Sequence, residues 1–540
     1  MSWLFGFYAK QQFGYPNISK YHPTAITTYH DANCYLAIGG NENLICYQSK
    51  EEKAKFFICG LGISSTEGNT LGVKEWDSLI NNSIEKLTDQ NGHYCGVCVY
   101  EESVQLFTDQ LGLREIHIVE NNEGWYFSTR IDWLFRIQKF EIDFKAFSSR
   151  WLLFNQISNK SIVQGIERLN CGSIGTITKN KLHIDKCNWL PKKTNDISID
   201  QFRENIREFI LLGARDRNKI SLSLSGGLDS RLVLSFLIDS GYKNWDCHLF
   251  KTDSKMDNII AKKILDNLNI PYHLYADTSR EDSDLLNNLY EYIGQTYITE
   301  SAFTSQNLTH YSCLPKNDII IDGGFGEIWR REFLTKLLVT GKHALEKRDL
   351  TVISNTLKRT HADIFNDDTS EIMNAGMLDQ LNEIIDALPG FKEVGLGNWL
   401  DIFSIKTRLV NYYGTEQARI DNYVNSYMPF AQKSLLNDLL NVPVSLRKNN
   451  KLFSKLFYPD TNNLTRYKLA KGNMSYPFYM NSVVKRIYFL VQSKMHRDKG
   501  TNDLDIFLDK MKEFVMDSLE GSPAKSYPYY NYNKICENVN

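Results

Sequence analysis

The chain has 540 residues, of which 42% are hydrophobic and 23% charged, and 62 Lys and Arg nearly balance 64 Asp and Glu to give a net charge of -2. Because this length exceeds what one hydrophobic core supports, about two or three domains are expected. The balanced charge provides no basic surface for a polyanion, so nucleic acid is not an expected partner.

The N-terminal stretch and the cysteines indicate a cytoplasmic protein. Residues 1–8 lack the basic segment and long hydrophobic core of a secretory signal, and no hydrophobic run reaches the length that crosses a bilayer. The ten Cys are scattered rather than spaced as a disulfide framework. Cys95 and Cys98 form the only close pair, which favours two ordinary thiols in a strand over a zinc or redox site.

Residues 1–190 predict a strand-rich domain. Short hydrophobic stretches such as Cys34-Tyr-Leu-Ala-Ile38 and Phe56-Phe-Ile-Cys59 are separated by clusters of Gly, Asn, Asp and Glu. A helical pattern from Trp76 to Leu87 interrupts them.

The second half of this region carries a series of three motifs. They are Leu87-Thr-Asp-Gln-Asn-Gly-His-Tyr-Cys-Gly96, Phe107-Thr-Asp-Gln-Leu-Gly-Leu-Arg114 and Trp125-Tyr-Phe-Ser-Thr-Arg130. The series resembles the N-terminal domain of class II glutamine amidotransferases, the glutaminase half of asparagine synthetases. That resemblance implies an Ntn-type β-rich sandwich for residues 1–190.

The catalytic positions of that family are altered here. The family nucleophile is a Cys that becomes the first residue after Met removal, with its own α-amino group as the base, whereas this chain has Ser2. The glutamine-binding Asn-Gly-Glu would fall in Phe57–Gly62, where Cys59 and Leu61 replace the polar pair. An N-terminal Ser is a poorer nucleophile than Cys. Ser2 is thus a catalytic candidate only for an alternative function, and a domain without glutaminase activity is favoured.

A polar, Pro-containing run over residues 191–199 predicts a linker to a second domain, 200–540. Ser198 to Asp200 are expected to cap the next helix. That helix carries hydrophobic residues at helical spacing, from Phe202 to Leu212.

The sequence from Ile220 to Gly241 predicts a strand, a glycine-rich turn and a helix. Small Ser residues alternate with Ile220, Leu222 and Leu224, and residues 232–238 have helical spacing up to Gly241. N–H groups at a helix N-terminus bind phosphate, and glycines allow the backbone to approach it closely. The predicted phosphate-binding residues are Leu224, Ser225, Gly226, Gly227, Leu228, Asp229 and Ser230.

This turn is not a Walker P-loop, because no Gly-Lys-Ser/Thr follows the glycines. Ser225-Gly-Gly-Leu-Asp-Ser230 instead matches the pyrophosphate-binding loop of the ATP pyrophosphatases that resemble asparagine synthetase. The resemblance implies that ATP is cleaved between its α and β phosphates, giving an acyl-adenylate and pyrophosphate. ATP and Mg²⁺ are the cofactors that it implies, with Asp229 as a metal ligand.

Three more strands are expected, at residues 245–250, 272–275 and 318–322, with a helix over 257–269. Alternating strands and helices predict a doubly wound parallel sheet that binds ligands at the carboxyl ends of its strands. Phe250, Asp322 and Gly323 lie at such ends and are candidate nucleotide contacts.

The segment Gly323-Gly-Phe-Gly-Glu-Ile-Trp-Arg-Arg331 follows the last of these strands. Its placement resembles the second phosphate-binding segment of asparagine synthetases, commonly Ser-Gly-Glu-Gly-Ser-Asp-Glu. Glu327 then takes the place of the metal-binding Asp, and Gly324 or Phe325 takes that of the Glu.

Asp229 and Glu327 are accordingly predicted to hold the ion that neutralises the departing pyrophosphate. A helix-capping role for Glu327 stays open, as do surface positions for Arg330 and Arg331.

From Leu400 onward the sequence predicts a helical lobe, and a further helix is expected over 503–519. Tyr427-Met-Pro-Phe430 stands where the family has Arg-x-Pro-Phe. Asn425 and Ala431 replace the carboxylates that usually flank it, which argues against plain asparagine synthesis.

The stretch Tyr467–Pro477 resembles the family segment Lys-x-Gly-Phe-x-x-Pro. The resemblance implies Lys471, with Lys468 as the fallback, as an active-site lysine that stabilises charge on the α-phosphate. A solvated surface lysine is the alternative.

These features favour an ATP-dependent ligase that adenylates a small-molecule or peptide carboxylate and transfers it to an amine. β-Lactam synthetases and lasso peptide cyclases share the intact loop without the N-terminal Cys. The alternatives are an amidotransferase that uses glutamine through Ser2 or takes free ammonia, and a non-catalytic nucleotide-binding paralogue. No membrane partner is expected, and a homodimer or a partner from the same biosynthetic cluster stays open.

Overall fold

A computed structural model of the chain describes most of its residues. They are 2–11, 17–48, 55–194, 196–215, 218–250, 255–275, 291–296, 308–331, 334, 337–338, 341–448, 450–457, 459–471, 474–480, 484, 488, 491, 512, 516 and 527–539. The helix expected over 503–519 lies almost entirely outside them.

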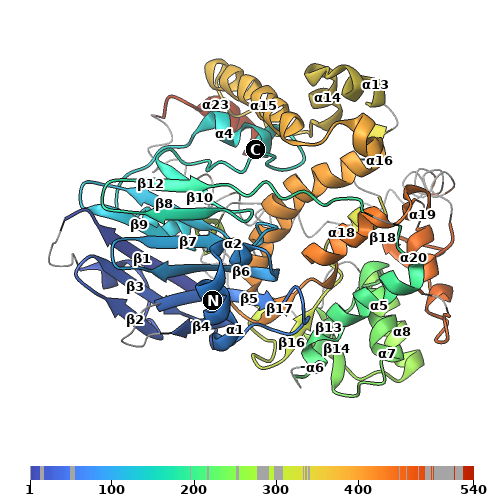
Figure 1. Cartoon of the computed structure of the whole chain (residues 1–540). Coiled ribbons are helices and arrows are strands. Elements are labelled where there is room, and N and C mark those ends of the chain that lie inside the picture. Colours follow the sequence, from blue (N-terminus) through green and yellow to red (C-terminus); the bar gives the residue numbers. More distant parts are fainter. Residues whose placement is uncertain are drawn as a thin grey trace.

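The first part of the chain forms two antiparallel six-stranded sheets that pack face to face (Figure 1). One sheet has the order β10-β8-β9-β1-β3-β2 and the other β12-β11-β7-β6-β5-β4. Leu36 and Phe127 of the first sheet meet Phe57 and Val97 of the second in one buried cluster. The strands are β1 (Trp3–Ala9), β2 (Thr27–His30), β3 (Cys34–Gly39), β4 (Ile45–Gln48), β5 (Lys55–Ile63), β6 (Asn91–Val99), β7 (Val104–Thr108), β8 (Ile116–Glu120), β9 (Gly124–Ser128), β10 (Ile166–Leu169), β11 (Ile174–Ile177) and β12 (Leu182–Asp185).

Helices cover the outer faces of these sheets, and one of them differs from the prediction. α1 (Val73–Asn82) packs Trp76 against the second sheet, and α3 (Ile131–Leu134) packs Trp133 against the first. The expected single helix from Trp76 to Leu87 is wrong, because the chain is extended at Ser83 (φ -168°, ψ 128°) before α2 (Ile84–Thr88). Ser83 is the N-cap residue of α2, a position that Ser favours and that requires a non-helical backbone, and its hydroxyl donates to Glu85 at 3.0 Å.

Cys95 and Cys98 lie in a strand, β6, as predicted. Cys95 lies between the two sheets and Cys98 lies under α1. Within the described ranges, no group of three or more His, Cys, Asp and Glu is placed to hold a metal ion. In the same ranges, no helix has the length and hydrophobicity needed to cross a membrane.

The second part contains a parallel five-stranded sheet with the order β15-β14-β13-β16-β17. The strands are β13 (Ile220–Ser223), β14 (Trp245–Phe250), β15 (Tyr272–Tyr275), β16 (Ile319–Ile321) and β17 (Asn425–Tyr427). Chain order runs outward in both directions from β13 and β16, so the topological switch point lies between these two strands. Ligands of open α/β sheets bind at the carboxyl ends of the strands at this point.

Helices pack around this sheet and extend beyond it. The predicted cap of α5 (Ile199–Ile210) is confirmed, because the Ser198 hydroxyl accepts from the N–H of Gln201 at 3.1 Å. The other helices beside the sheet are α6 (Leu212–Arg215), α7 (Asp229–Asp239), α8 (Lys255–Leu268), α10 (Leu308–Tyr311) and α11 (Gly326–Trp329).

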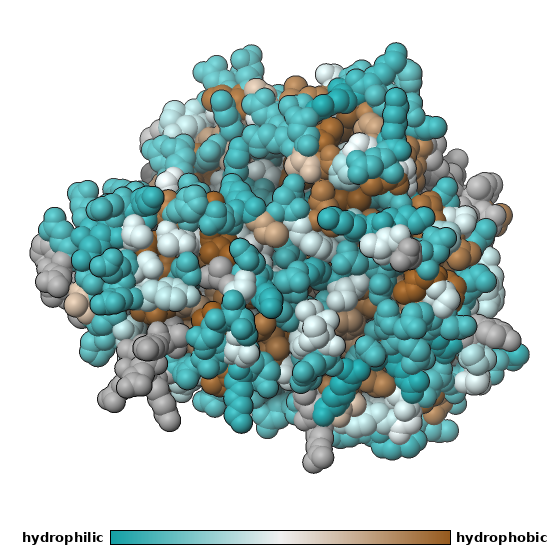
Figure 2. All heavy atoms as spheres, viewed as in Figure 1, coloured by the Kyte–Doolittle hydropathy of each residue, from teal (hydrophilic) through white to brown (hydrophobic). Residues whose placement is uncertain are grey.

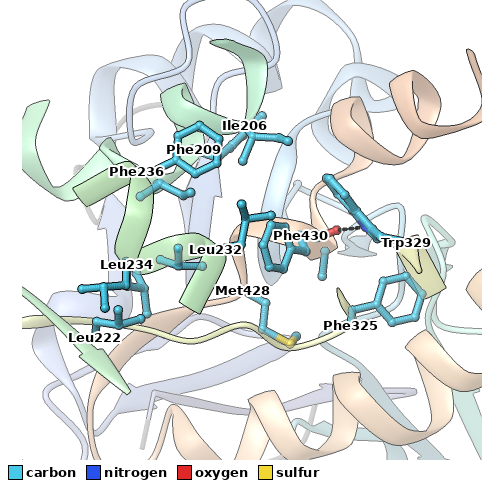
Figure 3. Packing of buried hydrophobic residues seen from close by; sticks show 14 of the residues in the cluster. Ile206, Phe209, Leu222, Leu232, Leu234, Phe236, Phe325, Trp329, Met428 and Phe430 are labelled. Atoms are coloured by element: carbon cyan, nitrogen blue, oxygen red, sulfur yellow. Dashed lines mark hydrogen bonds between the residues drawn. The ribbon is translucent and has the colours of Figure 1, made fainter. Parts of the chain in front are cut away.

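Figure 3 shows the core behind the switch point, where α5 and α7 meet the segments that follow β16 and β17. Trp329 lies against Phe202 and Phe430, and its indole N–H donates to the Phe430 carbonyl at 3.1 Å. Phe325 is fully buried in the same cluster. The loops at the switch point therefore rest on a packed hydrophobic base.

The chain from Leu400 onward is mostly helical, as expected, but the prediction missed three short strands. β17 completes the parallel sheet, and β18 (Leu469–Lys471) pairs with β19 (Met474–Tyr476). The remaining helices of the described residues include α4 (Phe144–Leu152), α13 (Lys342–Lys347), α14 (Leu350–Leu357), α15 (Asp367–Ala387), α16 (Phe391–Ser404), the π-helical stretch η4 (Ile405–Gly414), α17 (Thr415–Ile420), α18 (Lys433–Asn441), α19 (Val444–Arg447), α20 (Lys451–Leu456) and α23 (Tyr532–Val539). On the face seen in Figure 2 hydrophilic residues predominate, with hydrophobic residues showing near α14 and α16.

Buried charges join the two parts of the chain. Asp421, after α17, accepts from the Arg114 guanidinium at 2.8 Å and lies 3.2 Å from His93 Nε2, and all three side chains are almost fully buried. Burial by itself raises the pKa of Asp421, but His93 and Arg114 outweigh it and lower this pKa below its ordinary value. The Asp421 carboxylate is therefore held ionised between the two parts.

We predict that Asp421→Asn lowers the free energy of unfolding by about 3 kcal/mol at neutral pH, because it leaves the buried Arg114 without its counter-charge. A carboxyl whose folded pKa is lowered stabilises the protein above its unfolded pKa of about 4, and this stabilisation is lost as the pH falls through the folded pKa. The wild type and the variant should thus converge in acid. Urea unfolding at several pH values measures this, with Asp185→Asn, at an exposed pair with His183, as the control. A constant difference down to pH 3 would contradict the assignment.

Candidate functional site

The turn between β13 and α7 is braced by its own serines. The Ser225 N–H donates to Ser230 Oγ at 3.1 Å, the two hydroxyls lie 2.9 Å apart, and the Gly227 N–H donates to Ser225 Oγ at 3.1 Å. Leu224 and Leu228 are buried beneath the turn. The turn thus presents polar groups at the N-terminus of α7, a position suited to an anion.

The segment after β16 lies directly against this N-terminus. A Cβ on Gly323 would stand 2.5 Å from the Ser230 nitrogen, and one on Gly326 would stand 2.4 Å from the Asp229 carboxyl. Phe325 lies between these glycines with φ 70°, a left-handed conformation that is rare for a bulky residue and typical of functional sites. The two predicted phosphate-binding segments therefore meet at the switch point.

Asp322 and Phe250 also lie at carboxyl ends of strands. Asp322 Oδ1 accepts from the Gly324 N–H at 2.6 Å, and burial raises the pKa of the Asp322 carboxyl. Phe250 stacks on His310 with ring centroids 5.0 Å apart, and Tyr311 packs edge-on against it. Phe250 therefore belongs to an aromatic cluster beside the sheet.

Arginines hold both candidate metal ligands. Arg330 binds Asp229 through two bonds of 2.8 Å, and Arg408 Nε binds Glu327 Oε1 at 2.5 Å. Arg408 belongs to η4 and stacks over Tyr412 with 4.1 Å between the guanidinium and the ring centre.

Burial and the charges of Glu327 and Asp229 raise the pKa of the Tyr413 phenol, so both carboxylates act on one side chain. Surface positions for Arg330 and Arg331 are wrong. The Arg330 side chain is 10% exposed, and the buried Arg331 lies near Asp401.

A buried arginine ties the C-terminal hairpin to the glycine-rich turn. Arg231, on α7, is fully buried and donates to the carbonyls of Gly226, Leu464, Tyr467 and Lys468 at 2.8 to 3.3 Å. Burial lowers the pKa of its guanidinium to about 10, so it remains charged at neutral pH.

The hairpin itself also touches the turn. The Ala470 N–H donates to the Gly226 carbonyl at 3.0 Å. Lys471 is the next residue of β18 and is exposed at the end of that strand, whereas the Lys468 side chain is exposed before the strand begins. Lys471 is therefore nearer than Lys468, the alternative lysine, to Ala470, which contacts the turn.

Ser2 lies far from solvent, between the two parts of the chain. It is fully buried, and Arg114 Nη2 donates to its carbonyl at 2.8 Å and to its hydroxyl at 3.3 Å. Gln295 and Thr296 line the adjoining cavity, whose volume is about 10 Å³. This holds about one water molecule, and glutamine does not fit in this arrangement.

Sequence reasoning missed three residues of the site. Arg231 follows the recognised loop but carries no motif of its own, and Arg408 lies in a helix without a readable pattern. The third is Asp257 of α8, whose carboxylate accepts from the Gly226 N–H, and whose pKa is raised by burial. Of these three residues only Arg231 had a signal in the sequence, because it is a charged residue within a hydrophobic stretch of helix.

Comparisons with known proteins add little. No family model matches the sequence, and no curated protein matches it. A glutamine-dependent NAD⁺ synthetase from Acinetobacter baumannii, solved with ADP, is 14% identical over 33% of this chain and 38% of its own, with a TM-score of 0.20.

Two further solved structures are similarly distant. A glutamine phosphoribosylpyrophosphate amidotransferase from B. subtilis, with ADP and GMP, is 10% identical over 56% of this chain and 63% of its own, with a TM-score of 0.20. An allosteric regulatory enzyme of purine biosynthesis is 11% identical over 61% of this chain and 77% of its own, with a TM-score of 0.22. This chain thus spans 38% and 63% of the length of the first two structures. Scores this low establish neither its fold family nor its activity.

We predict that Arg231→Met loosens the hairpin from the turn, because four backbone carbonyls lose their donor. Trypsin should then cleave after Arg466, Lys468 or Lys471 about tenfold faster than in the wild type, because a lost charged hydrogen bond is worth about 1.5 to 3 kcal/mol. Arg231→Lys should give an intermediate rate.

Arg203→Met, at an ion pair with Asp239 on the surface of the same helix pair, is the control. Mass spectrometry of the fragments locates the cuts. Unchanged cleavage in folded Arg231→Met would contradict the role of Arg231.

Proposed function

We propose that the protein is an ATP-dependent synthetase that forms amide bonds, similar to asparagine synthetases but without glutaminase activity. The observation that carries this proposal is the meeting of two segments, 224–230 and 322–327, at the switch point of the parallel sheet. The sequence predicts phosphate binding for both segments. Their contact at the N-terminus of α7 supports a common anionic ligand, the triphosphate of ATP.

In the first step of the proposed reaction, a carboxylate oxygen attacks the α-phosphorus of ATP and the bond to the β-phosphate breaks. Acyl-adenylate and pyrophosphate are the products. Ser225, Gly227 and Ser230 would position the leaving pyrophosphate, whose oxygens would accept from donors that otherwise bond within the turn. In the second step an amine attacks the acyl carbon, AMP leaves, and the amine loses a proton.

The donor groups present suit Mg²⁺ when phosphate completes the site, because magnesium is commonly held by one or two carboxylates together with substrate phosphates. Asp229 and Glu327 would hold it, and it would supply positive charge to the departing pyrophosphate. Guanidinium groups pair with both carboxylates in the structure. Arg330 and Arg408 therefore also lie where they could bind phosphate oxygens.

We assign Lys471 to the α-phosphate, where its ammonium would stabilise the charge that develops as the adenylate forms. The bond from Ala470 to Gly226 and the four bonds of Arg231 support this assignment, because they fix β18 beside the turn. Phe250 is assigned to the edge of the nucleotide site.

We propose that residues 1–190 form an Ntn-type domain that serves as a scaffold, joined by the linker 191–199 to a synthetase domain, 200–540, in a cytoplasmic protein. The enclosure of Ser2 by Gln295 and Thr296 supports a loss of glutaminase activity. The amine would then be ammonia or a substrate amine rather than an amide nitrogen from glutamine.

We predict that Asp229→Asn lowers exchange of labelled pyrophosphate into ATP by about 10²-fold or more, the usual cost of one lost transition-state contact. The assay contains Mg²⁺ and a panel of amino acids, sugar acids and peptides as carboxylates. Asp239→Asn, at the other end of α7, is the matched control and should retain full exchange.

If Asp229→Asn exchanges labelled pyrophosphate into ATP at the wild-type rate, the assignment of Asp229 as a metal ligand is wrong. No exchange by the wild type with any carboxylate would favour a non-catalytic nucleotide-binding protein. Glutamate release from glutamine that Ser2→Ala abolishes would favour the amidotransferase instead.

A further inference from the structure

A cavity of about 630 Å³ lies between the first part of the chain and the helices α15 and η4. Its volume falls in the range of small-molecule sites, about 300–1,000 Å³. Its walls include most residues between Ile157 and Ser173, together with Gln380 and Lys406. Neither Asp229 nor Glu327 borders it, so it is distinct from the proposed nucleotide site.

Lys406 brings an incompletely satisfied charge to this cavity. The residue is 8% exposed, and its ammonium donates to the Trp189 carbonyl at 3.0 Å. Across the residues that the structure describes, no carboxylate lies within 4.0 Å of it. An ammonium has three donors, and a buried charge is costly unless an opposite charge or several acceptors compensate it.

Two amide side chains that line the same cavity each have one atom without a hydrogen-bond partner. Asn170 is 4% exposed, and its Nδ2 group has no hydrogen-bond partner. Asn159 donates to Cys171 Sγ at 3.5 Å, while its own Oδ1 atom is buried without a partner. Buried polar atoms are usually paired, and these two line one cavity beside the Lys406 ammonium, where a bound polar group could satisfy both.

The backbone at this wall is strained. Cys171 adopts φ 52° and Gly172 φ 72°, in the turn between β10 and β11. A left-handed conformation is uncommon at a non-glycine residue, and such residues cluster at functional sites. Burial raises the pKa of the Cys171 thiol, and Lys406 and Arg168 oppose this rise, which shows that both cations act on the same wall.

We propose that this cavity binds a small organic carboxylate that carries a hydroxyl or amino group near its carboxylate. The carboxylate pairs with Lys406 and accepts from Asn170 Nδ2. The hydroxyl or amino group donates to Asn159 Oδ1. Cys171 lies beside the bound molecule and takes no part in chemistry.

Competitive alkylation of the full-length protein tests the anion preference. Equimolar iodoacetate, an anion, and iodoacetamide, its neutral analogue, are applied together. Mass spectrometry then gives, at each Cys, the ratio of the iodoacetate product to the iodoacetamide product. This ratio at Cys171 should exceed that at the exposed Cys313 about five-fold, the effect of one nearby charge in a partly aqueous site.

Lys406→Gln should bring the ratio at Cys171 down to that at Cys313. Lys406→Arg should retain the preference, and Lys392→Gln, at an exposed position on the preceding helix, should leave it unchanged. Equal ratios at both cysteines in the wild type would overturn the proposal. So would a Cys171 that neither reagent reaches, or a preference that survives in folded Lys406→Gln.

Protection of the wild-type protein gives a second measurement that needs no variant. Lactate should slow alkylation of Cys171 by iodoacetamide more than lactamide does, and also more than propionate does. Equal protection by lactate and lactamide would overturn the anion site. Equal protection by lactate and propionate would overturn the assignment of Asn159.

Discussion

The site depends on one steric constraint: the segment after β16 must pass within contact distance of the first residues of α7. Glycine at 323 and 326 makes this approach possible, because any side chain there would overlap Ser230 or Asp229. The left-handed Phe325 turns the chain between the two glycines, and its buried ring fastens the turn to the core in Figure 3. The contact at the two glycines, the left-handed backbone of Phe325 and the packing of its ring therefore depend on one another.

Electrostatics then explains how two carboxylates can share this site. Asp229 and Glu327 would repel each other if both stood unpaired beside Tyr413. Arg330 and Arg408 remove that repulsion, because each forms an ion pair with one of the two carboxylates. In the proposed reaction a phosphate would attract the same guanidinium groups, and its binding would then compete with these ion pairs.

The sequence allowed the parallel strands and the loops at their ends to be predicted well. The stretches 220–224, 245–250, 272–275 and 318–322 had hydrophobic runs bounded by turns, and each appears as a strand within one or two residues. β17 could not be predicted, because Asn425-Ser-Tyr427 has no hydrophobic pattern and becomes a strand only by pairing with β16.

The site was predictable only where residues adjoin a motif. Ser225 to Ser230 and Asp322 to Glu327 are local in the sequence, and their chemistry can be inferred from their types. The arginine partners are different, because Arg408 is 81 positions from Glu327 and Arg330 is 101 from Asp229. Nothing in a single sequence specifies such a pair, since many arginines could serve.

Long-range charge pairs also give residues 1–190 a structural role that does not require glutaminase activity. Asp421 is buried against Arg114 and His93, and Asn411 of η4 accepts from Arg168 at 2.7 Å. Removing residues 1–190 would leave Asp421 without these partners and expose the surface on which η4 rests. Because η4 also carries Arg408, which holds Glu327, the geometry of the proposed nucleotide site depends on the sandwich even if Ser2 never meets a substrate.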